Sequence, residues 1–310
     1  MNTGFKIIGW GSSVPDKVLT NADLEKIVET SDEWIVERTG IRERRVGAES
    51  TAGLAVEAGR KAFERAGVTG ADVDFVVAAT ITPDRPCPGI AATVQVELGI
   101  NGGAMDVNAA CSGFAYGLVT AQGLIMAGAK RVLVIGAERL STITDYTDRN
   151  TAVLFGDGAG ALLVEAVQEG GDVLSWDAGC DGSLAHLLYA DYGDYIRMDG
   201  KEVFRNAVRA VVESSTKVLS EAGVSADEIS LLVPHQANIR IVQAVCQRLG
   251  IPEERAAMVI DKYANTSSAS IPLALVDALE HGRVQPGDLL LLTGFGAGMT
   301  WASCVLRWPA

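Results

Sequence analysis

Apolar residues along the chain gather in short runs that alternate with longer stretches of mixed character. The runs at 73–80, 131–138 and 229–236 have the length of strands and predict buried strands, the first of them in a parallel pairing. The mixed stretches at 52–66 and 203–222 have the spacing of helices. Strands that alternate with helices in this way indicate an α/β fold.

Two features recur in both halves of the chain. The strand at 73–80 corresponds to the strand at 229–236, and the glycine-rich turns 156–160 and 294–298 each feed a strand. We interpret the repeat as a duplication into two packed βαβ-rich halves, at 1–168 and 169–310. The pattern also predicts helices at 90–98, 113–127, 238–249 and 271–279, and strands at 104–108, 258–261, 288–293 and 300–307.

Composition and charge exclude several classes of function. The chain has 310 residues and a formal net charge of −13, which argues against nucleic-acid binding. No signal segment starts the chain and no apolar run could span a bilayer, so we expect a cytoplasmic protein without a membrane segment. The five cysteines form no Cys-x-x-Cys pair, which fits a reducing compartment and argues against disulfides and metal sites.

Cys111 stands at the joint between a short strand and an uncharged helix that we expect to be buried all round. The N–H groups of a helix N-terminus stabilise an anion, so they would lower the pKa of the thiol and could hold an oxyanion beside it. Small neighbours leave room for a substrate. Most free cysteines, however, are small buried hydrophobes, and the stretch alone supports both interpretations equally.

Two more polar residues follow predicted strands. His235 ends the strand at 229–236, and Asn265 lies in a polar loop of small residues. Active sites of open α/β sheets form at the carboxyl ends of strands, so these residues could meet Cys111. A thiolate, an imidazole and an amide together suit acyl transfer. Individually, His235 fits a core histidine and Asn265 a turn residue, whereas the three together favour a site.

A local basic cluster stands out in this acidic chain. Arginines at 38, 42, 44 and 45 follow Trp34. They suit either a solvated surface with ion pairs or a phosphate site with Trp34 as a stacking surface, and the first is the more common arrangement.

Seven motifs in order along the chain resemble those of the β-ketoacyl-acyl carrier protein synthases III, within the thiolase superfamily. They lie at 30–35, 38–44, 108–114, 155–160, 233–238, 265–267 and 294–298. The combination of Cys111, His235 and Asn265 also distinguishes the chain from the elongating synthases, which use two histidines. The resemblance implies a thiolase-like fold of two duplicated halves in five layers, αβαβα.

The resemblance further implies an enzyme that starts fatty acid synthesis in two steps. An acyl-CoA primer would load on Cys111, and His235 and Asn265 would then hold malonyl-acyl carrier protein while it loses CO₂ and condenses with the acyl group. The backbone amides of Cys111 and Ala297 would form the oxyanion hole, and Phe295 would shield the decarboxylation pocket. No cofactor would be needed, the carrier protein would be the partner, and the enzyme would be a homodimer.

Substrate-binding residues are carried over by position. The adenine of CoA would lie between Trp34 and Arg149. The pantetheine and phosphate path would be lined by Thr30, Arg38, Gly200, Phe204 and Asn238. The acyl pocket would comprise Cys87, Leu140 and Phe155, and the carrier-protein patch Arg205 and Arg240.

Three positions depart from the family pattern. Ala264 stands where glycine often precedes the asparagine, and Ser112 stands where alanine is frequent. In the family, the loop that holds Cys87 reaches into the partner subunit's acyl pocket, where a bulky aromatic restricts primers to short ones. Because cysteine is smaller, we expect branched or longer primers.

Two other functions are compatible with the same residues. One is a starter-unit ketosynthase or acyltransferase of a secondary-metabolite pathway, and the other, more remote, is a non-catalytic acyl-CoA or carrier-protein binding module.

Overall fold

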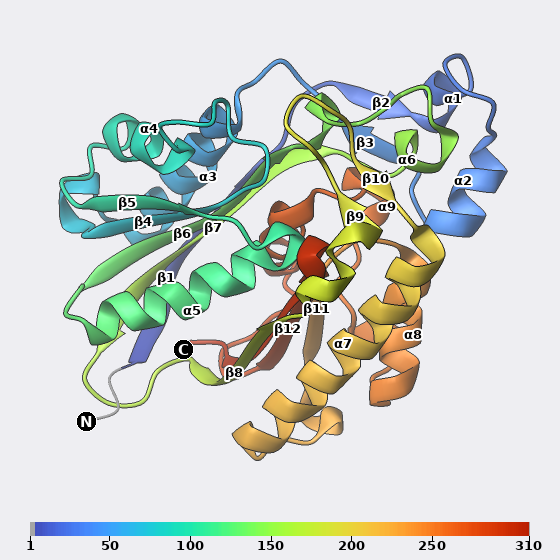
Figure 1. The fold of residues 1–310 in the computed structure, drawn as a ribbon. Helices are drawn as coiled ribbons and strands as arrows, with labels where there is room; N and C mark the ends of the chain where they lie inside the picture. The colour runs from blue at the N-terminus through green and yellow to red at the C-terminus, as the bar shows by residue number, and fades with distance from the viewer. Residues whose placement is uncertain (1–3, 310) are drawn as a thin grey trace.

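Two mixed β-sheets organise the chain in a computed structural model, which describes residues 4–309. In the first sheet the strands run in the order β1-β7-β6-β4-β5, and in the second β11-β12-β13-β8 (Figure 1). The strands of the first sheet are β1 (Gly4–Ser13), β4 (Phe75–Ala79), β5 (Gly103–Val107), β6 (Arg131–Arg139) and β7 (Asp157–Val167). Those of the second are β8 (Val173–Cys180), β11 (Leu231–Pro234), β12 (Leu289–Gly296) and β13 (Thr300–Arg307).

The two sheets share one pairing pattern. In the first, β7 lies antiparallel between β1 and β6, and β6 pairs parallel with β4. In the second, β13 lies antiparallel between β8 and β12, and β12 pairs parallel with β11. The place of β5 is taken by an isolated parallel bridge between Leu232 and Ala256. The repeated order and direction confirm that the fold consists of two duplicated βαβ-rich halves.

Helices α5 (Gly113–Met126) and α10 (Ser270–Glu280) lie between the sheets, where the most apolar surfaces meet. Phe114 of α5 and Ile271 of α10 share one buried core with Val134 of the first sheet and with residues of the second. Such a layer can form because both helices are apolar on most of their surface. Removal of this surface from water is the main stabilisation of the interface between the halves.

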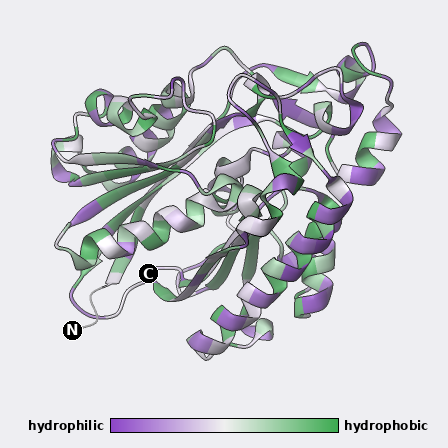
Figure 2. Cartoon of the chain, in the orientation of Figure 1, coloured by the Kyte–Doolittle hydropathy of each residue, from purple (hydrophilic) through white to green (hydrophobic). Residues whose placement is uncertain are grey.

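Two helix pairs cover the outer faces and complete the five layers. Helices α3 (Thr51–Ala66) and α4 (Ile90–Glu97) pack on the first sheet, and α7 (Gly200–Ala222) and α8 (Ile239–Leu249) pack on the second. The central parts of the strands in the two large sheets are mostly apolar, whereas polar residues mark the outward side of α7 (Figure 2). This is the distribution expected for strands buried on both faces and amphipathic outer helices.

Short elements form a cap over one end of the sheets. They are α1 (Asn21–Leu24), α2 (Asp32–Thr39), α6 (Arg149–Ala152), α9 (Ile260–Tyr263), the ribbon β2 (Val18–Thr20) with β3 (Glu43–Arg45), and the ribbon β9 (Leu188–Tyr189) with β10 (Arg197–Met198). Ser31 caps α2 by accepting the N–H of Trp34, and Gly40 ends the helix at φ 81°. A separate apolar cluster that includes Ile35 and Leu140 holds this cap together.

The structure corrects three local predictions. Residues 258–261, predicted as a strand, lead into helix α9, because the side chain of Gln236 binds the Val259 N–H and the chain leaves the sheet. Glycines 158 and 160, predicted in a turn, lie within β7, where a Cβ on Gly160 would come within 2.6 Å of the Pro272 side chain. Helix α5 is not buried all round, since Met126 is 70% exposed at its end.

Three short turns lie near the residues that we predict to form the active site. They are the 3₁₀ turns η2 (Ala110–Ser112), η7 (Ser267–Ala269) and η8 (Ala297–Met299). Within residues 4–309, no helix is both long and apolar enough to cross a membrane. Residues 1–3, at which we predict no signal segment, lie outside the described part of the chain.

Candidate active site

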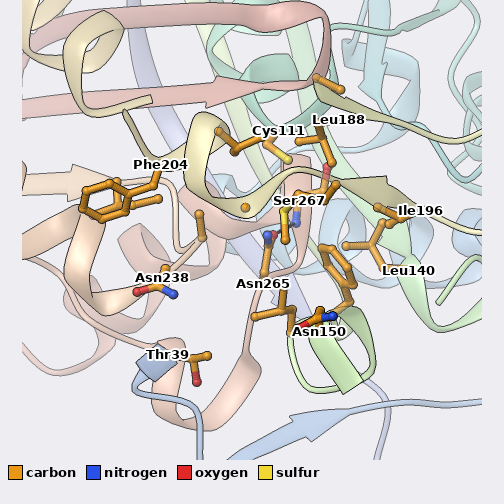
Figure 3. A pocket seen from close by; sticks show the side chains of 18 of the residues that line it. Thr39, Cys111, Leu140, Asn150, Leu188, Ile196, Phe204, Asn238, Asn265 and Ser267 are labelled. Carbon is orange, nitrogen blue, oxygen red and sulfur yellow. Dashed lines mark hydrogen bonds between the residues drawn. The ribbon is translucent and has the colours of Figure 1, made fainter. Parts of the chain in front are cut away.

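A cavity of about 1040 Å³ lies where the cap meets the ends of both sheets. Its walls include Cys111 from the first half and His235 and Asn265 from the second. In the close view Cys111 and Asn265 face the same space, with Leu140 on one side and Phe204 on the other (Figure 3). The three polar residues predicted to meet therefore line one cavity, although they are far apart in the sequence.

A strained turn presents Cys111. The preceding residue, Ala110, has φ 47°, a conformation that alanine rarely adopts outside functional sites. The turn is held by Ser112, whose hydroxyl donates to the Ala109 carbonyl at 2.7 Å. The end of β12 comes very close, because a Cβ at Gly296 would lie 2.5 Å from the Cys111 nitrogen. Glycine at this position thus allows the two backbones of the two halves to meet beside the thiol.

The resting state of Cys111 differs from the prediction. Burial raises the pKa of the Cys111 thiol to about 12. The Ser267 hydroxyl lowers the pKa, but by less. Desolvation therefore outweighs the stabilisation of the anion that we expected at the start of a helix. The raised pKa favours the thiol form of Cys111 at neutral pH.

His235 is held as a neutral ring. Its backbone N–H donates to the Thr293 carbonyl at 2.8 Å, which continues the pairing of β11 with β12. Burial lowers the pKa of His235 to about 3, so the imidazole is uncharged at neutral pH. The ring packs edge-on against Phe295, with centroids 5.6 Å apart. Its Nδ1 has no hydrogen-bond partner among residues 4–309. A neutral imidazole with a proton on Nε2 can donate into the cavity.

Asn265 is oriented by its own loop. Its backbone N–H donates to the Leu154 carbonyl at 2.9 Å, and its carbonyl accepts the Gly156 N–H at 3.0 Å. Its side-chain Oδ1 accepts the Ser267 N–H at 2.8 Å. Because the amide oxygen is used in this way, the Nδ2 group is left to donate to a group in the cavity. Two neutral donors, from His235 and Asn265, can therefore converge on one substrate oxygen.

Ala264 occupies a backbone region that is essentially restricted to glycine, with φ 56° and ψ −155°. A β-branched residue fits this conformation worst, because its second γ-branch crowds the backbone. We expect Ala264→Val to destabilise the fold by about 3 kcal/mol, whereas Ala264→Gly stays within about 1 kcal/mol of the parent. Thermal unfolding of both variants measures the difference. Equal midpoints for the two variants would show that this backbone is not strained.

The oxyanion-hole and shielding candidates also reach the cavity. Ala297 and Phe295 both line it, and Phe295 is buried. Turn η8 is tied to the second sheet by two backbone hydrogen bonds between Asp181 and Met299, at 2.9 and 3.1 Å. These bonds give the turn a fixed place, which a preorganised oxyanion hole requires.

Most residues predicted for CoA line the outer part of the same cavity. They are Trp34, Arg38, Gly200, Phe204 and Asn238. Asn238 joins the two halves here, since it caps α8 and donates through Nδ2 to the Arg38 carbonyl at 3.0 Å. Thr30 and Arg149 do not line the cavity, although the Thr30 hydroxyl is buried without a partner among residues 4–309.

The predicted adenine sandwich is closed in this structure. The guanidinium of Arg149 lies 4.1 Å from the centroid of the Trp34 ring, and that of Arg38 lies 4.8 Å from it. An aromatic ring between Trp34 and Arg149 needs about twice the stacking distance. Arg149 must therefore move before an adenine can stack on Trp34 from that side.

Of the residues predicted for the acyl pocket and for the carrier-protein patch, some line the cavity and others do not. Leu140 and Phe155 are buried and line the cavity, but Cys87 is exposed and does not line the cavity of its own chain. Arg205 is exposed and pairs with Glu202 at 2.6 Å. Arg240 lines the cavity and lies 3.9 Å from Glu37.

One member of the basic cluster fits neither sequence interpretation. Arg44 is fully buried, and its guanidinium donates to Asn21 Oδ1 at 2.8 Å and to the Val153 carbonyl at 2.8 Å. It is therefore a structural cross-link within the cap, between α1 and the residue that follows α6, and neither a solvated charge nor a phosphate ligand. Sequence reasoning also missed Glu138 as part of the site, although a glutamate that ends an apolar run is an unusual pattern.

Comparison with known proteins identifies the family. The chain matches the family models 3-oxoacyl-[acyl-carrier-protein] synthase III over residues 105–182 and its C-terminal domain over residues 219–308. It is 52% identical over 312 residues to β-ketoacyl-[acyl-carrier-protein] synthase III 1 of Bacillus cereus, with 99% of each chain covered. The enzyme of Geobacillus kaustophilus is 52% identical over 309 residues, which cover 98% of this chain and 99% of that protein.

Solved structures agree with this assignment. The synthase III from Aquifex aeolicus superposes with a TM-score of 0.96 at 48% identity, covering 98% of this chain and all of that one (100%). The priming β-ketosynthase of a polyketide pathway superposes with a TM-score of 0.94 at 35% identity, covering 99% of this chain and 96% of that one. The chain belongs to the β-ketoacyl-[acyl-carrier-protein] synthase III family.

Proposed function

We propose that this enzyme starts fatty acid synthesis by condensing an acyl-CoA primer with malonyl-acyl carrier protein. The observation that carries the proposal is the convergence of Cys111, His235 and Asn265 on one cavity that is long enough to continue outward past Trp34. A thiol and two neutral donors supply a nucleophile and a site for a developing enolate. Neither step needs a group beyond the two substrates.

In the first step the Cys111 sulfur attacks the thioester carbonyl of the primer. The new C–S bond forms as the carbonyl π electrons move to oxygen, and the backbone N–H groups of Cys111 and Ala297 hold this oxyanion. When the carbonyl re-forms, the bond to CoA breaks and CoA leaves as the thiol with the proton from Cys111. Because burial keeps that proton on the resting sulfur, its loss is coupled to substrate binding.

In the second step malonyl-acyl carrier protein occupies the cavity. Its carboxylate C–C bond breaks, CO₂ leaves, and the electron pair forms an enolate whose oxygen is held by Nε2–H of His235 and Nδ2 of Asn265. The enolate carbon then attacks the acyl-Cys111 carbonyl, and the C–S bond breaks to release the β-ketoacyl product and the Cys111 thiolate. This thiolate takes a proton from water, which restores the thiol. The depressed pKa of His235 suits this role, because a neutral donor stabilises the enolate without protonating it.

We propose the same outer route for CoA and for the carrier protein's arm. Trp34, Arg38, Gly200, Phe204 and Asn238 line it, and Thr30 and Arg149 stand beside it. Arg205 and Arg240 are exposed at least in part near its mouth and would meet the acidic carrier protein. The halves 1–168 and 169–310, a homodimer and a cytoplasmic location complete the proposal.

The test is the intact mass of the enzyme after mixing with acetyl-, isobutyryl- and hexanoyl-CoA, followed by malonyl-acyl carrier protein. We expect an acyl adduct that disappears as a β-ketoacyl carrier protein appears. An adduct that persists with the malonyl substrate but is transferred to an alcohol or amine would favour the acyltransferase alternative. The absence of any adduct would favour a binding module, and either outcome would overturn the proposal.

Primer choice gives a second test, which concerns Cys87. Its exposure in the isolated chain fits a loop that enters the partner subunit's pocket. Filling this position in Cys87→Phe should lower kcat/KM for hexanoyl-CoA and isobutyryl-CoA by about 10–100-fold relative to acetyl-CoA, since pocket contacts discriminate by this amount. Cys87→Ser, which keeps the volume, is the control. An unchanged primer ratio in Cys87→Phe would remove Cys87 from the acyl pocket.

A further inference from the structure

Glu138 is a fully buried carboxyl group at the end of β6 that the proposed mechanism does not use. Removing a carboxyl group from water is costly unless hydrogen bonds replace the lost solvation. Here every hydrogen bond comes from a neutral group. The hydrogen-bond partners of the carboxyl group are Thr80 Oγ1 at 3.2 Å, Ile81 N at 3.1 Å, Thr82 N at 3.2 Å, Thr82 Oγ1 at 2.5 Å and Ser268 Oγ at 2.8 Å.

These partners come from both halves of the molecule. Thr80 directly follows β4 in the first half, and Ile81 beside it lines the cavity. Ser268 belongs to turn η7 in the second half. A single carboxyl group therefore joins the end of the first sheet to the turn that follows Asn265.

The turn depends on this link for its place. Ser267 has φ 48°, a conformation that persists only where neighbouring contacts impose it. Its N–H donates to Asn265 Oδ1 at 2.8 Å, so the position of the Ser267 backbone sets the direction of the Asn265 amide. The next residue, Ser268, is anchored to Glu138, and a Cβ at Gly136 of the same strand would lie 2.2 Å from the Ser268 carbonyl oxygen.

The single hydroxyl proton of Ser268 indicates the protonation state of Glu138. The Ser268 hydroxyl has one proton but lies 2.8 Å from both Glu138 Oε1 and the Ala79 carbonyl. Both contacts are satisfied if Glu138 is a carboxylic acid that donates to Ser268, which in turn donates to Ala79. Burial acts in the same direction, because it raises the pKa of the Glu138 carboxyl. Glutamine at 138 can reproduce this pattern, with Nε2 as donor and its oxygen as acceptor.

We propose that Glu138 is a positioning residue that braces turn 265–268 against the end of the first sheet and thereby aims Asn265 at the substrate. This inference rests on the proposed role of Asn265 in decarboxylation. The backbone of Cys111 is held separately, by Ser112 and the close approach of Gly296, and only its sulfur meets the turn, through the Ser267 hydroxyl. Loss of the brace should therefore impair decarboxylation of the malonyl group more than acylation of Cys111.

The experiment measures the two half-reactions in Glu138→Ala and Glu138→Gln. Acylation of Cys111 by acetyl-CoA is followed by mass, and decarboxylation of malonyl-acyl carrier protein by CO₂ release without primer. We expect Glu138→Ala to slow decarboxylation by about 10–100-fold and acylation by less than about 3-fold, because small displacements of a positioned group have effects of this size. Glu138→Gln should remain within about 3-fold of the parent in both.

Two further variants separate positioning from general instability. Ser268→Ala removes one side of the brace and should show the same selective loss, although a smaller one. Asp177→Ala removes another buried carboxylate, which accepts from Ser214 at 2.8 Å and Lys217 at 2.6 Å on the second sheet; it should show no such selectivity. Equal slowing of both half-reactions in Glu138→Ala, or a Glu138→Gln variant as impaired as Glu138→Ala, would overturn the proposal. Failure of Asn265→Ala to slow decarboxylation would instead contradict the proposed function.

Discussion

Cys111→Ala should abolish condensation, with a loss in kcat on the order of 10⁴-fold or more, because Cys111 is the only thiol among the described residues that line the cavity. Incubation with acetyl-CoA should leave the mass of this variant unchanged. Release of CO₂ from malonyl-acyl carrier protein should continue, since the two donors that hold the enolate are intact. Mass measurement and CO₂ release test these two expectations on the same protein sample.

Cys246→Ala is the matched control for that variant. Cys246 is a buried thiol on α8 that does not line the cavity, so its loss tests the effect of removing a sulfur from the core. It should retain both the adduct and the condensation. An acetyl adduct on Cys111→Ala, or loss of the adduct in Cys246→Ala, would assign the nucleophile to another residue.

Asn265→Ala should show the opposite pattern. Removal of one of the two donors to the enolate oxygen should reduce decarboxylation by about 10²–10³-fold, the usual effect of losing a preorganised donor at a developing charge. Acylation of Cys111 should change little, because in our proposal backbone amides hold the oxyanion of that step. Single-turnover loading by acetyl-CoA and CO₂ release from malonyl-acyl carrier protein measure the two steps separately.

Asn206→Ala provides the matched control for the asparagine. Asn206 is buried on α7, outside the cavity, and donates to the Glu202 carbonyl at 2.9 Å. Its removal should leave both half-reactions close to the parent. If Asn265→Ala instead lost acylation and decarboxylation together, Asn265 would have a structural role and the division of labour between the two steps would be wrong.

Local sequence patterns determined the order and type of most elements. The apolar runs at 131–138 and 73–80 are strands β6 and β4, and the mixed stretch at 52–66 is helix α3, which Ser50 caps. These predictions succeed because a strand buried on both faces and a capped helix depend on residues close together in the chain. The failure at 258–261 has the same origin, since an apolar run is equally compatible with burial in a short helix.

The sequence also identified which residues meet at the site. Cys111 follows β5 and His235 follows β11, and the ends of strands in an α/β fold open on a common edge. Asn265 follows the short helix α9 and reaches this edge through its backbone hydrogen bonds to Leu154 and Gly156. The structure places all three on one cavity, as the motifs predict.

Only the tertiary structure decided the charge states and the hydrogen-bond partners of these side chains. Burial of Cys111 raises its pKa, which local sequence led us to expect to be lowered, because desolvation depends on atoms brought from the second half. Arg44 is in the core because Asn21 and the Val153 carbonyl meet it there. Glu138 reaches Ser268 across 130 positions of sequence. Helix and strand types follow from neighbours along the chain, whereas charge state and hydrogen-bond partners follow from neighbours in space, which no local pattern encodes.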